Sequence, residues 1–270
     1  MKRALSLAFL LLVCAVLVLP LWLMVTNSFT PTQAFLRLPP RFLPHIPTLD
    51  NYRAIFRLPL LGRWALNSLG VVAVIVFAGI VVNGAAGYVF GFNSRRWVKV
   101  AFWSMMTPIF VTRFVLLISQ FVITGKLGLR GLAAVVLMSV FWPTGIFLFR
   151  NYFSGIPISL IESARLDGAS EWRIFASIVL PLSKPIVGAG MVFLGMGALG
   201  DYIWQMLNLQ RKEIQTVLVG LMNTTIDVRV VNNIGYDLAV GTLLFLPYLV
   251  LFAASSRYFI KGLTLGGIKE

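Results

Sequence analysis

Charged residues are scarce in this chain. Of its 270 residues only 12% are Asp, Glu, Lys or Arg, whereas 59% are hydrophobic. A soluble domain carries about 25% charged residues. So few polar groups cannot cover the surface of a soluble protein of this size. The composition therefore predicts that lipid is the solvent for most of the chain.

Cysteine and histidine are almost missing. The single cysteine, Cys14, excludes an intrachain disulfide and a cysteine metal cluster, and the single histidine, His45, is expected to be a solvated loop residue. There is no Gly-x-x-x-x-Gly-Lys-Ser/Thr sequence, so the chain does not cradle ATP by a P-loop. No Ser–His–Asp set, metal cluster or His-Glu-x-x-His sequence is present. We expect no catalytic residues, no metal and no cofactor in this chain.

Acidic residues are the rarer of the two charge types. Nine Asp and Glu stand against 23 Lys and Arg, a formal net charge of +14. A nucleic-acid-binding protein would gather its basic residues on one face or helix. Here they are spread over all the segments between the apolar runs. The pattern argues against nucleic acid and favours an anionic membrane surface as partner.

Long apolar runs occupy most of the sequence. A bilayer core needs about 20 apolar residues per helix, and backbone in lipid must form helices or a closed barrel. These runs are too long and too continuous for barrel strands. We predict an all-α polytopic membrane protein with a single domain, 1–270, and six transmembrane helices, the first being an uncleaved helix rather than a signal peptide. The six expected spans are Ala4–Val25, Ser68–Phe90, Val98–Ser119, Gly131–Phe149, Pro185–Leu207 and Leu238–Phe259.

Basic residues at the ends of the runs predict the orientation. Lys2 and Arg3 place the N-terminus inside, and six crossings then make both termini cytoplasmic. A tight basic cluster at residues 95–99 supports this orientation, whereas Arg57 and Arg63 oppose it. The proline-rich segment 27–63 is expected to be an extended loop on the outside.

Residues 151–184 form the one long polar stretch with helical order. Ser159-x-x-Glu162 has the form of a capping box, in which serine and glutamate side chains satisfy each other's backbone N–H groups. It predicts a short helix from Leu160 to Asp167. With both termini inside, this segment is cytoplasmic.

The same stretch contains signals for a turn and a second helix. Gly168 fits the left-handed position after a helix end. Ser170 is predicted to cap a second helix that runs through Val179, and Pro181 is predicted to end it.

One side of the first helix is expected to be a docking face. Leu160, Ile161 and Ala164 share a side, and the small residues Ser163 and Ala164 permit a partner to approach closely. A helix seated in a partner's groove is one interpretation. The alternative is a helix that lies on the lipid surface and has no further role.

The spacing of this stretch resembles a known motif. Glu162-Ser163-Ala164, three residues, Gly168, nine residues, and Ile178-x-Leu180-Pro181 resemble the EAA motif of bacterial ABC importer permeases, with Ser163 where that family prefers Ala. Residues 149–153, 167–170 and 257–269 are similar to the second permease of maltose-type sugar importers.

The resemblance implies a type I ABC importer permease fold in the bacterial inner membrane. It implies a heterodimer with a second permease, two ATPase subunits that bind ATP and Mg, and an extracytoplasmic solute-binding protein. The helix that carries Glu162 would be the coupling helix in a cleft of the ATPase. The residues assigned to ATPase coupling are Ser159, Glu162, Ser163, Ala164, Asp167, Gly168, Ile178, Leu180 and Pro181.

Several polar residues lie within or beside the apolar runs. Arg113 is either a functional charge with Asp201 as counter-ion or a side chain that snorkels to the outer surface. Asn83, which lies among glycines, is read as helix packing more than solute contact. Tyr202 and Trp204 suit stacking on a sugar, or anchoring at the membrane interface. The candidate pathway residues are Arg113, Asp201, Tyr202, Trp204 and Asn83.

The sequence is compatible with three functions. The first is a permease subunit of an ATP-driven sugar importer. The second is an importer permease for glycerol phosphate or another small organic solute. The third, from another class, is a membrane enzyme or assembly factor, which would need a set of catalytic residues that the sequence does not offer.

Overall fold

The computed structural model describes residues 2–35, 47–226 and 233–265, and the side chains among them other than those of 2–4, 32–33 and 254–265. Every regular element in these ranges is helical; His45 lies outside them. The helices are α1 Lys2–Asn27, α2 Thr32–Phe35, α3 Asp50–Phe56, α4 Leu61–Phe92, α5 Arg96–Met106, the 3-10 helix η1 Thr107–Phe110, α6 Arg113–Lys126, α7 Leu132–Val140, α8 Pro143–Phe153, α9 Ile158–Leu166, α10 Glu171–Ile174, the π-helix η2 Phe175–Val179, α11 Leu180–Leu182, α12 Lys184–Gly200, α13 Tyr202–Asn208, the 3-10 helix η3 Lys212–Ile214, α14 Val217–Ile226 and α15 Ile234–Leu265.

The apolar helices agree with a six-span membrane protein. Within the described residues four helices are long and apolar enough to cross a bilayer, and two bent helix pairs bring the number up to six. The four are Leu5–Asn27, Leu61–Phe92, Leu132–Phe153 and Ile234–Ala253, and the bent pairs are Arg96–Phe110 with Arg113–Lys126 and Glu171–Leu182 with Lys184–Gly200. The all-α polytopic fold predicted from the runs is confirmed.

Three of the expected spans are not continuous helices. The third, expected over 98–119, bends by 112° after Phe110, because the chain passes through a 3-10 turn that contains Pro108 and then through an extended Val111. The fifth, expected over 185–207, is interrupted at Asp201 between α12 and α13. The fourth is also broken between α7 and α8, since Phe141 has extended backbone and Trp142, which precedes Pro143, is not helical.

The segment expected as an extended outer loop contains two short helices. Where the structure describes it, α2 and α3 follow α1, and the expectation of a wholly extended segment is therefore wrong. The amide of Asn51 on α3 donates to the backbone oxygens of Ser28 at 2.8 Å and Thr30 at 3.0 Å. These buried bonds hold α3 against the end of α1, and Ser28 is fully buried as a result.

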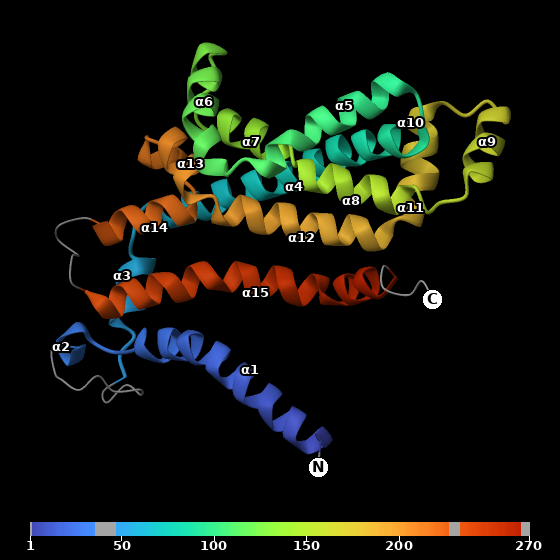
Figure 1. The fold of residues 1–270 in the computed structure, drawn as a ribbon. Coiled ribbons are helices and arrows are strands. Elements are labelled where there is room, and N and C mark those ends of the chain that lie inside the picture. Colours follow the sequence, from blue (N-terminus) through green and yellow to red (C-terminus); the bar gives the residue numbers. More distant parts are fainter. Residues whose placement is uncertain (1, 36–46, 227–232, 266–270) are drawn as a thin grey trace.

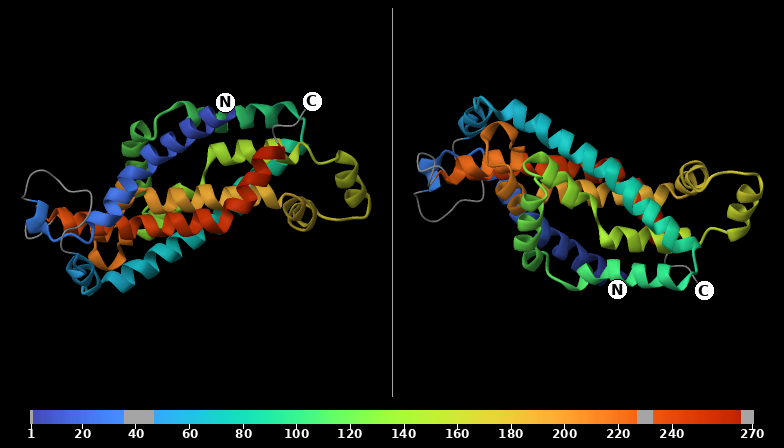
Figure 2. Two further views of the ribbon diagram at one scale, coloured as in Figure 1. Left: turned by 90° about the horizontal axis from the view of Figure 1, so that it is seen from below. Right: turned by 90° about the horizontal axis from the view of Figure 1, so that it is seen from above.

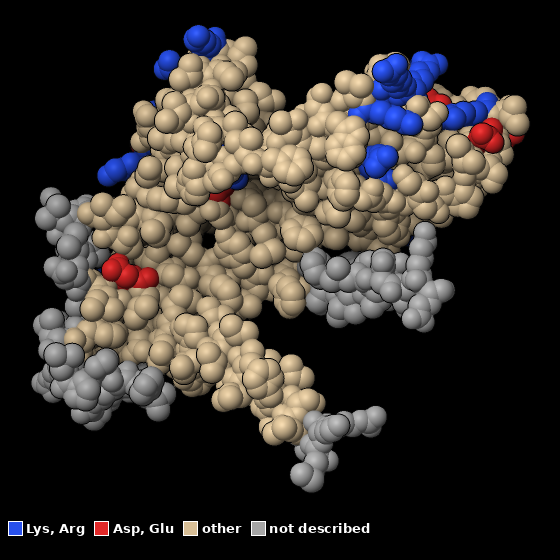
Figure 3. Space-filling view, viewed as in Figure 1, with Lys and Arg blue, Asp and Glu red and all other residues tan. Residues whose placement is uncertain are grey.

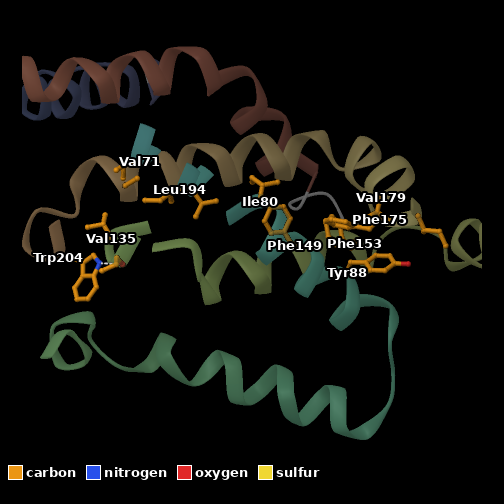
Figure 4. Packing of buried hydrophobic residues seen from close by; sticks show 14 of the residues in the cluster. Val71, Ile80, Tyr88, Val135, Phe149, Phe153, Phe175, Val179, Leu194 and Trp204 are labelled. Atoms are coloured by element: carbon orange, nitrogen blue, oxygen red, sulfur yellow. Dashed lines mark hydrogen bonds between the residues drawn. The ribbon is translucent and has the colours of Figure 1, made fainter. Parts of the chain in front are cut away.

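The core is built around α4, which packs against α7, α8 and α12. Close approach of α8 requires Gly87, because a Cβ there would lie 2.6 Å from the Cβ of Phe149. Figure 4 shows the buried apolar side chains in a row from Val71 past Ile80 to Phe175. The core therefore runs along the bundle as far as the end that carries α10.

The two ends of the bundle differ. Figure 1 shows α9 projecting at one end, and the first turns of α1 and the last turns of α15 point toward that end. Short helices α2, α3 and α14 lie at the opposite end, and the views of Figure 2 agree. The region 151–184, the first turns of α1 and the last turns of α15 thus lie toward one end of the molecule.

Candidate functional site

Helix α9 ends in a Schellman motif. Gly168 has φ of 77°, its N–H donates to the Arg165 oxygen at 3.0 Å, and the Ala169 N–H donates to the Ala164 oxygen at 3.0 Å. The predicted left-handed glycine is confirmed. The chain reverses here so that α10 returns toward the bundle.

The start of α9 differs from the prediction. The helix begins at Ile158, the N-cap position is Pro157, and no side chain caps the helix. Ser159 lies inside the first turn rather than at the cap, because the proline starts the helix two residues earlier than expected. The predicted capping box of Ser159 and Glu162 is therefore wrong, and both side chains are free to face solvent.

Two residues of the predicted docking face of α9 point into the protein and not toward a partner. Ile161 is fully buried and Ala164 nearly so, and both belong to the protein's own core. Neither can anchor a partner, because their surfaces are already covered. The outward face carries Leu160 and Ser163 from the predicted face together with Ile158, Glu162, Leu166 and Asp167, with Leu166 89% exposed.

A polar cluster fastens α9 to α10 and α4. The guanidinium of Arg165 donates to Glu171 through Nε at 2.7 Å and Nη2 at 3.1 Å, and the Tyr88 hydroxyl donates to the same carboxylate at 2.5 Å. The Arg165 and Tyr88 hydrogen bonds hold the pKa of Glu171 below its usual value of 4.5. We call Arg165, Glu171 and Tyr88 the clasp.

The clasp was not foreseen from the sequence. Arg165 and Glu171 are six residues apart, which is not a helical spacing, and Tyr88 is 83 residues distant from Glu171. Only the reversal at Gly168 brings them together. A cavity of about 570 Å³ adjoins the clasp and is also lined by Arg95. In Figure 3 basic side chains gather at this end of the molecule.

The second helix of the stretch is close to its prediction. The Ser170 hydroxyl accepts a bond from the Arg173 N–H at 3.3 Å, which confirms the predicted cap. Ile178 and Leu180 pack against the core. Pro181 does not end the helix, which continues to Leu182. The end comes at Ser183 instead, and α12 leaves at 90° to the preceding helix.

Arg113 and Asp201 form an ion pair. A guanidinium nitrogen of Arg113, at the first residue of α6, bonds to a carboxylate oxygen of Asp201, at the α12–α13 break. The Asp201 side chain is 10% exposed and that of Arg113 is 56% exposed. Both charges thus sit at helix interruptions, not within continuous spans as the sequence suggested.

Two of the candidate pathway residues face the core. The Asn83 amide donates to Gly79 at 2.6 Å and Val140 at 2.8 Å, and its oxygen accepts from the Trp142 N–H at 2.9 Å. Asn83 is fully buried, so it ties together the α7–α8 break and does not line a pathway.

Trp204 is 1% exposed and its indole N–H donates to the Ala134 oxygen at 3.3 Å, as Figure 4 also shows. Trp204 therefore packs in the core; it does not contact a solute or anchor the chain at the membrane interface in this structure. Tyr202 is half-buried at the start of α13. Among the described residues no group of three or more His, Cys, Asp or Glu is arranged to hold a metal ion.

Known proteins are similar to this chain in sequence and in fold. The chain is 32% identical over 260 residues to the arabinooligosaccharides transport system permease protein AraQ of Halalkalibacterium halodurans, covering 93% of this chain and 91% of that one. It is 33% identical over 229 residues to the maltodextrin transport system permease protein MalD of Streptococcus pneumoniae, covering 82% and 79%.

A crystal structure of a bacterial ABC transporter involved in the import of the acidic polysaccharide alginate contains a chain that superposes with a TM-score of 0.82 at 19% identity, covering 96% of both chains. Residues 75–264, which include the clasp and the ion pair, match one family along their whole length. The chain belongs to the family of binding-protein-dependent transport system inner membrane components.

Proposed function

We propose that this chain is a transmembrane subunit of an ATP-driven, binding-protein-dependent sugar importer, and that α9 couples it to an ATPase. Membership of the transport family and the sugar-transport relatives support the first part. The observation that carries the second is the two-sided nature of α9. Its outer face exposes Glu162 and Leu166 to a partner, while Ile161 on its inner face is buried in the bundle core.

This arrangement gives a mechanical path from the partner to the spans. Movement of α9 would pull on α10 through the clasp and on α4 through Tyr88. Phe175 and Val179 join the same apolar core as Phe149 on α8. Because a packed core deforms little, a displacement of α9 would rock these helices together and not be absorbed locally.

The partners follow from this function. Two ATPase subunits would supply ATP and Mg chemistry at the α9 end, a second permease would complete the pathway, and a solute-binding protein would deliver the sugar on the opposite side. Both termini would then be cytoplasmic, on the side of α9. An organic phosphate importer is the alternative within transport; it would require an unpaired cation along the path, and Arg113 is paired with Asp201.

The coupling role is tested by Glu162→Ala, with Glu213→Ala as matched control. Both carboxylates are exposed, that of Glu162 on α9 and that of Glu213 on η3, so the fold should tolerate both changes. The assembly is purified through a tag on this chain and placed in proteoliposomes. Loss of a charged interface contact worth about 1.4 kcal/mol should lower ATPase association about tenfold in Glu162→Ala. Glu213→Ala should stay within twofold of wild type.

Equal association and equal uptake of labelled maltotriose, arabinotriose or galactotriose in wild type and Glu162→Ala would remove the coupling role from this face. If an assembly that hydrolyses ATP takes up none of these sugars, the result would argue against a sugar as the transported solute. The test of coupling through Glu162 would still be valid.

A further inference from the structure

Helix interruptions from three parts of the chain surround one cavity. It has a volume of about 460 Å³. Its wall includes the extended residue Val111 between η1 and α6, the α7–α8 break at Phe141 and Trp142, and the last turn of α12. Irregular backbone at membrane depth is tolerated only where it is buried in protein or lines a cavity. In transporters such broken helices commonly form the solute site.

The cavity lies at mid-depth in the expected bilayer. Phe193 and Gly197 line it from α12 and follow Lys184, the first residue of that helix, by nine and thirteen positions. At about 1.5 Å per residue they are roughly 14 and 20 Å from Lys184 along the axis. A hydrocarbon core of about 30 Å places them near its centre.

Polar side chains line this cavity although it is at membrane depth. Arg113 and Gln120 lie on one face of α6 at a spacing of seven residues, and Ser139 and Thr144 flank the α7–α8 break. Within the described residues the buried Ser139 hydroxyl has no hydrogen-bond partner. Polar groups on a lipid-facing surface are costly, so this wall is expected to face a second permease and a solute.

The remaining wall is apolar and includes aromatic side chains. The rings of Trp142 and Phe193 lie with centroids 5.7 Å apart, and both line the cavity. The flat faces of aromatic rings suit the apolar face of a sugar ring, while the hydroxyls of the sugar suit the amide and hydroxyl groups opposite.

Charge decides between a neutral and an anionic solute. Arg113 is the one charged residue in the described wall, and its charge is compensated by Asp201. A phosphate or carboxylate would have to compete with this ion pair. A neutral solute would instead bind without breaking it.

We propose that this cavity is a saccharide subsite, in which Trp142 supplies the stacking surface and Gln120 and Thr144 supply hydrogen bonds. The inference rests on the proposed importer function and adds that this subunit itself contacts the solute, through a site selective for neutral, hydroxyl-rich molecules. The Arg113–Asp201 pair closes one side and excludes anions.

A protection experiment tests the subsite directly. Thr144→Cys is introduced into a Cys14→Ser background, because Thr144 lines the cavity and is exposed. The assembly purified through this chain is labelled with a small thiol reagent during ATP turnover. Maltotriose, arabinotriose and galactotriose are added one by one, with glycerol 3-phosphate as anionic comparison. At least one trisaccharide should slow labelling by at least threefold, and glycerol 3-phosphate should not.

Variants of the aromatic wall complete the test. Trp142→Ala should abolish protection, and Trp142→Phe, which keeps a ring, should retain most of it. Trp103→Ala is the control, since Trp103 is 66% exposed on α5 and does not line this cavity.

No protection by any trisaccharide overturns the subsite, and uptake of a sugar by that same assembly would leave the proposed function standing. Protection by glycerol 3-phosphate alone overturns the selectivity for neutral solutes. Protection that survives in Trp142→Ala removes the stacking role. The Thr144→Cys protein could lose ATPase activity and uptake and still show protection. That result would support the subsite, because slower labelling reports solute binding and not transport.

Discussion

Arg165 at the end of α9 and Glu171 at the start of α10 form a two-point ion pair across the Gly168 turn, with Nε–Oε1 at 2.7 Å and Nη2–Oε2 at 3.1 Å. Paired contacts of this kind fix the relative orientation of the two groups as well as their distance. The carboxylate also accepts the Tyr88 hydroxyl from α4. A force on α9 therefore reaches a membrane-spanning helix through one carboxylate.

Breaking the clasp should uncouple ATP hydrolysis from uptake. In Glu171→Ala we expect the sugar transported per ATP to fall about threefold to tenfold, with the amount of chain in the membrane unchanged, because the pair is partly exposed and contributes little to stability. The double variant Arg165→Glu with Glu171→Arg should recover part of the coupling. A wild-type transport ratio in Glu171→Ala would show that the clasp carries no force.

The stabilising contribution of the clasp should be lost at low pH. The pKa of Glu171 is lowered in the folded protein, so its stabilising contribution is present above the usual value of 4.5 and is lost as pH falls through the lower, folded value. Hydrogen exchange of residues 158–175, corrected for intrinsic rates, should show greater protection in wild type than in Glu171→Gln at pH 7. The two proteins should converge as pH falls below 4.5 and through the lower, folded value. A protection difference that increases as pH falls below 4.5 would contradict this account.

Gly168 should be sensitive to backbone strain rather than to space. A Cβ at this position would meet no atom within 4 Å, but φ is 77°. Gly168→Ala should therefore destabilise the turn by roughly 1–2 kcal/mol, which hydrogen exchange at Ala169 and Ser170 would report. Gly168→Asn is the matched control, because asparagine tolerates the left-handed region better. Equal effects of Ala and Asn would point to a lost contact instead of strain.

Asn83 should be a stability residue. Asn83→Ala leaves the Trp142 N–H and the Val140 oxygen without their present partner, and each unsatisfied buried group costs about 1–3 kcal/mol. We expect a lower unfolding midpoint in detergent. Asn67→Ala is a control, because Asn67 also donates to two backbone oxygens but one of its bonds is solvent-exposed. A larger loss in Asn67→Ala than in Asn83→Ala would contradict the ranking.

The orientation can be read from single cysteines in a Cys14→Ser background. Leu49→Cys, at a site 52% exposed between α2 and α3, should react with an impermeant thiol reagent from outside the cell, and Ser163→Cys on α9 only after the membrane is opened. Ser28 would not report, because it is buried. The reverse pattern of labelling would invert the topology.

The sequence by itself determined the class of the protein and the form of its polar segment. Runs of about 20 apolar residues admit few structures in lipid, and the spans follow from them. Gly168 and Ser170 were predicted correctly because a left-handed turn and a helix cap depend on the residue and its immediate neighbours. The motif spacing from Glu162 to Pro181 also belongs to the sequence.

Tertiary structure alone decided which residues face a partner and which face the core. Helical periodicity placed Ile161 and Ala164 on one side of α9 but did not say that this side packs inward. Likewise, from the sequence the amide of Asn83 and the indole of Trp204 could have contacted a solute. In the fold both donate hydrogen bonds to backbone oxygens. The ion pair of Arg113 with Asp201, 88 residues apart, depends on where two helices break. Such contacts join distant segments, and local sequence patterns hold no information about the partner.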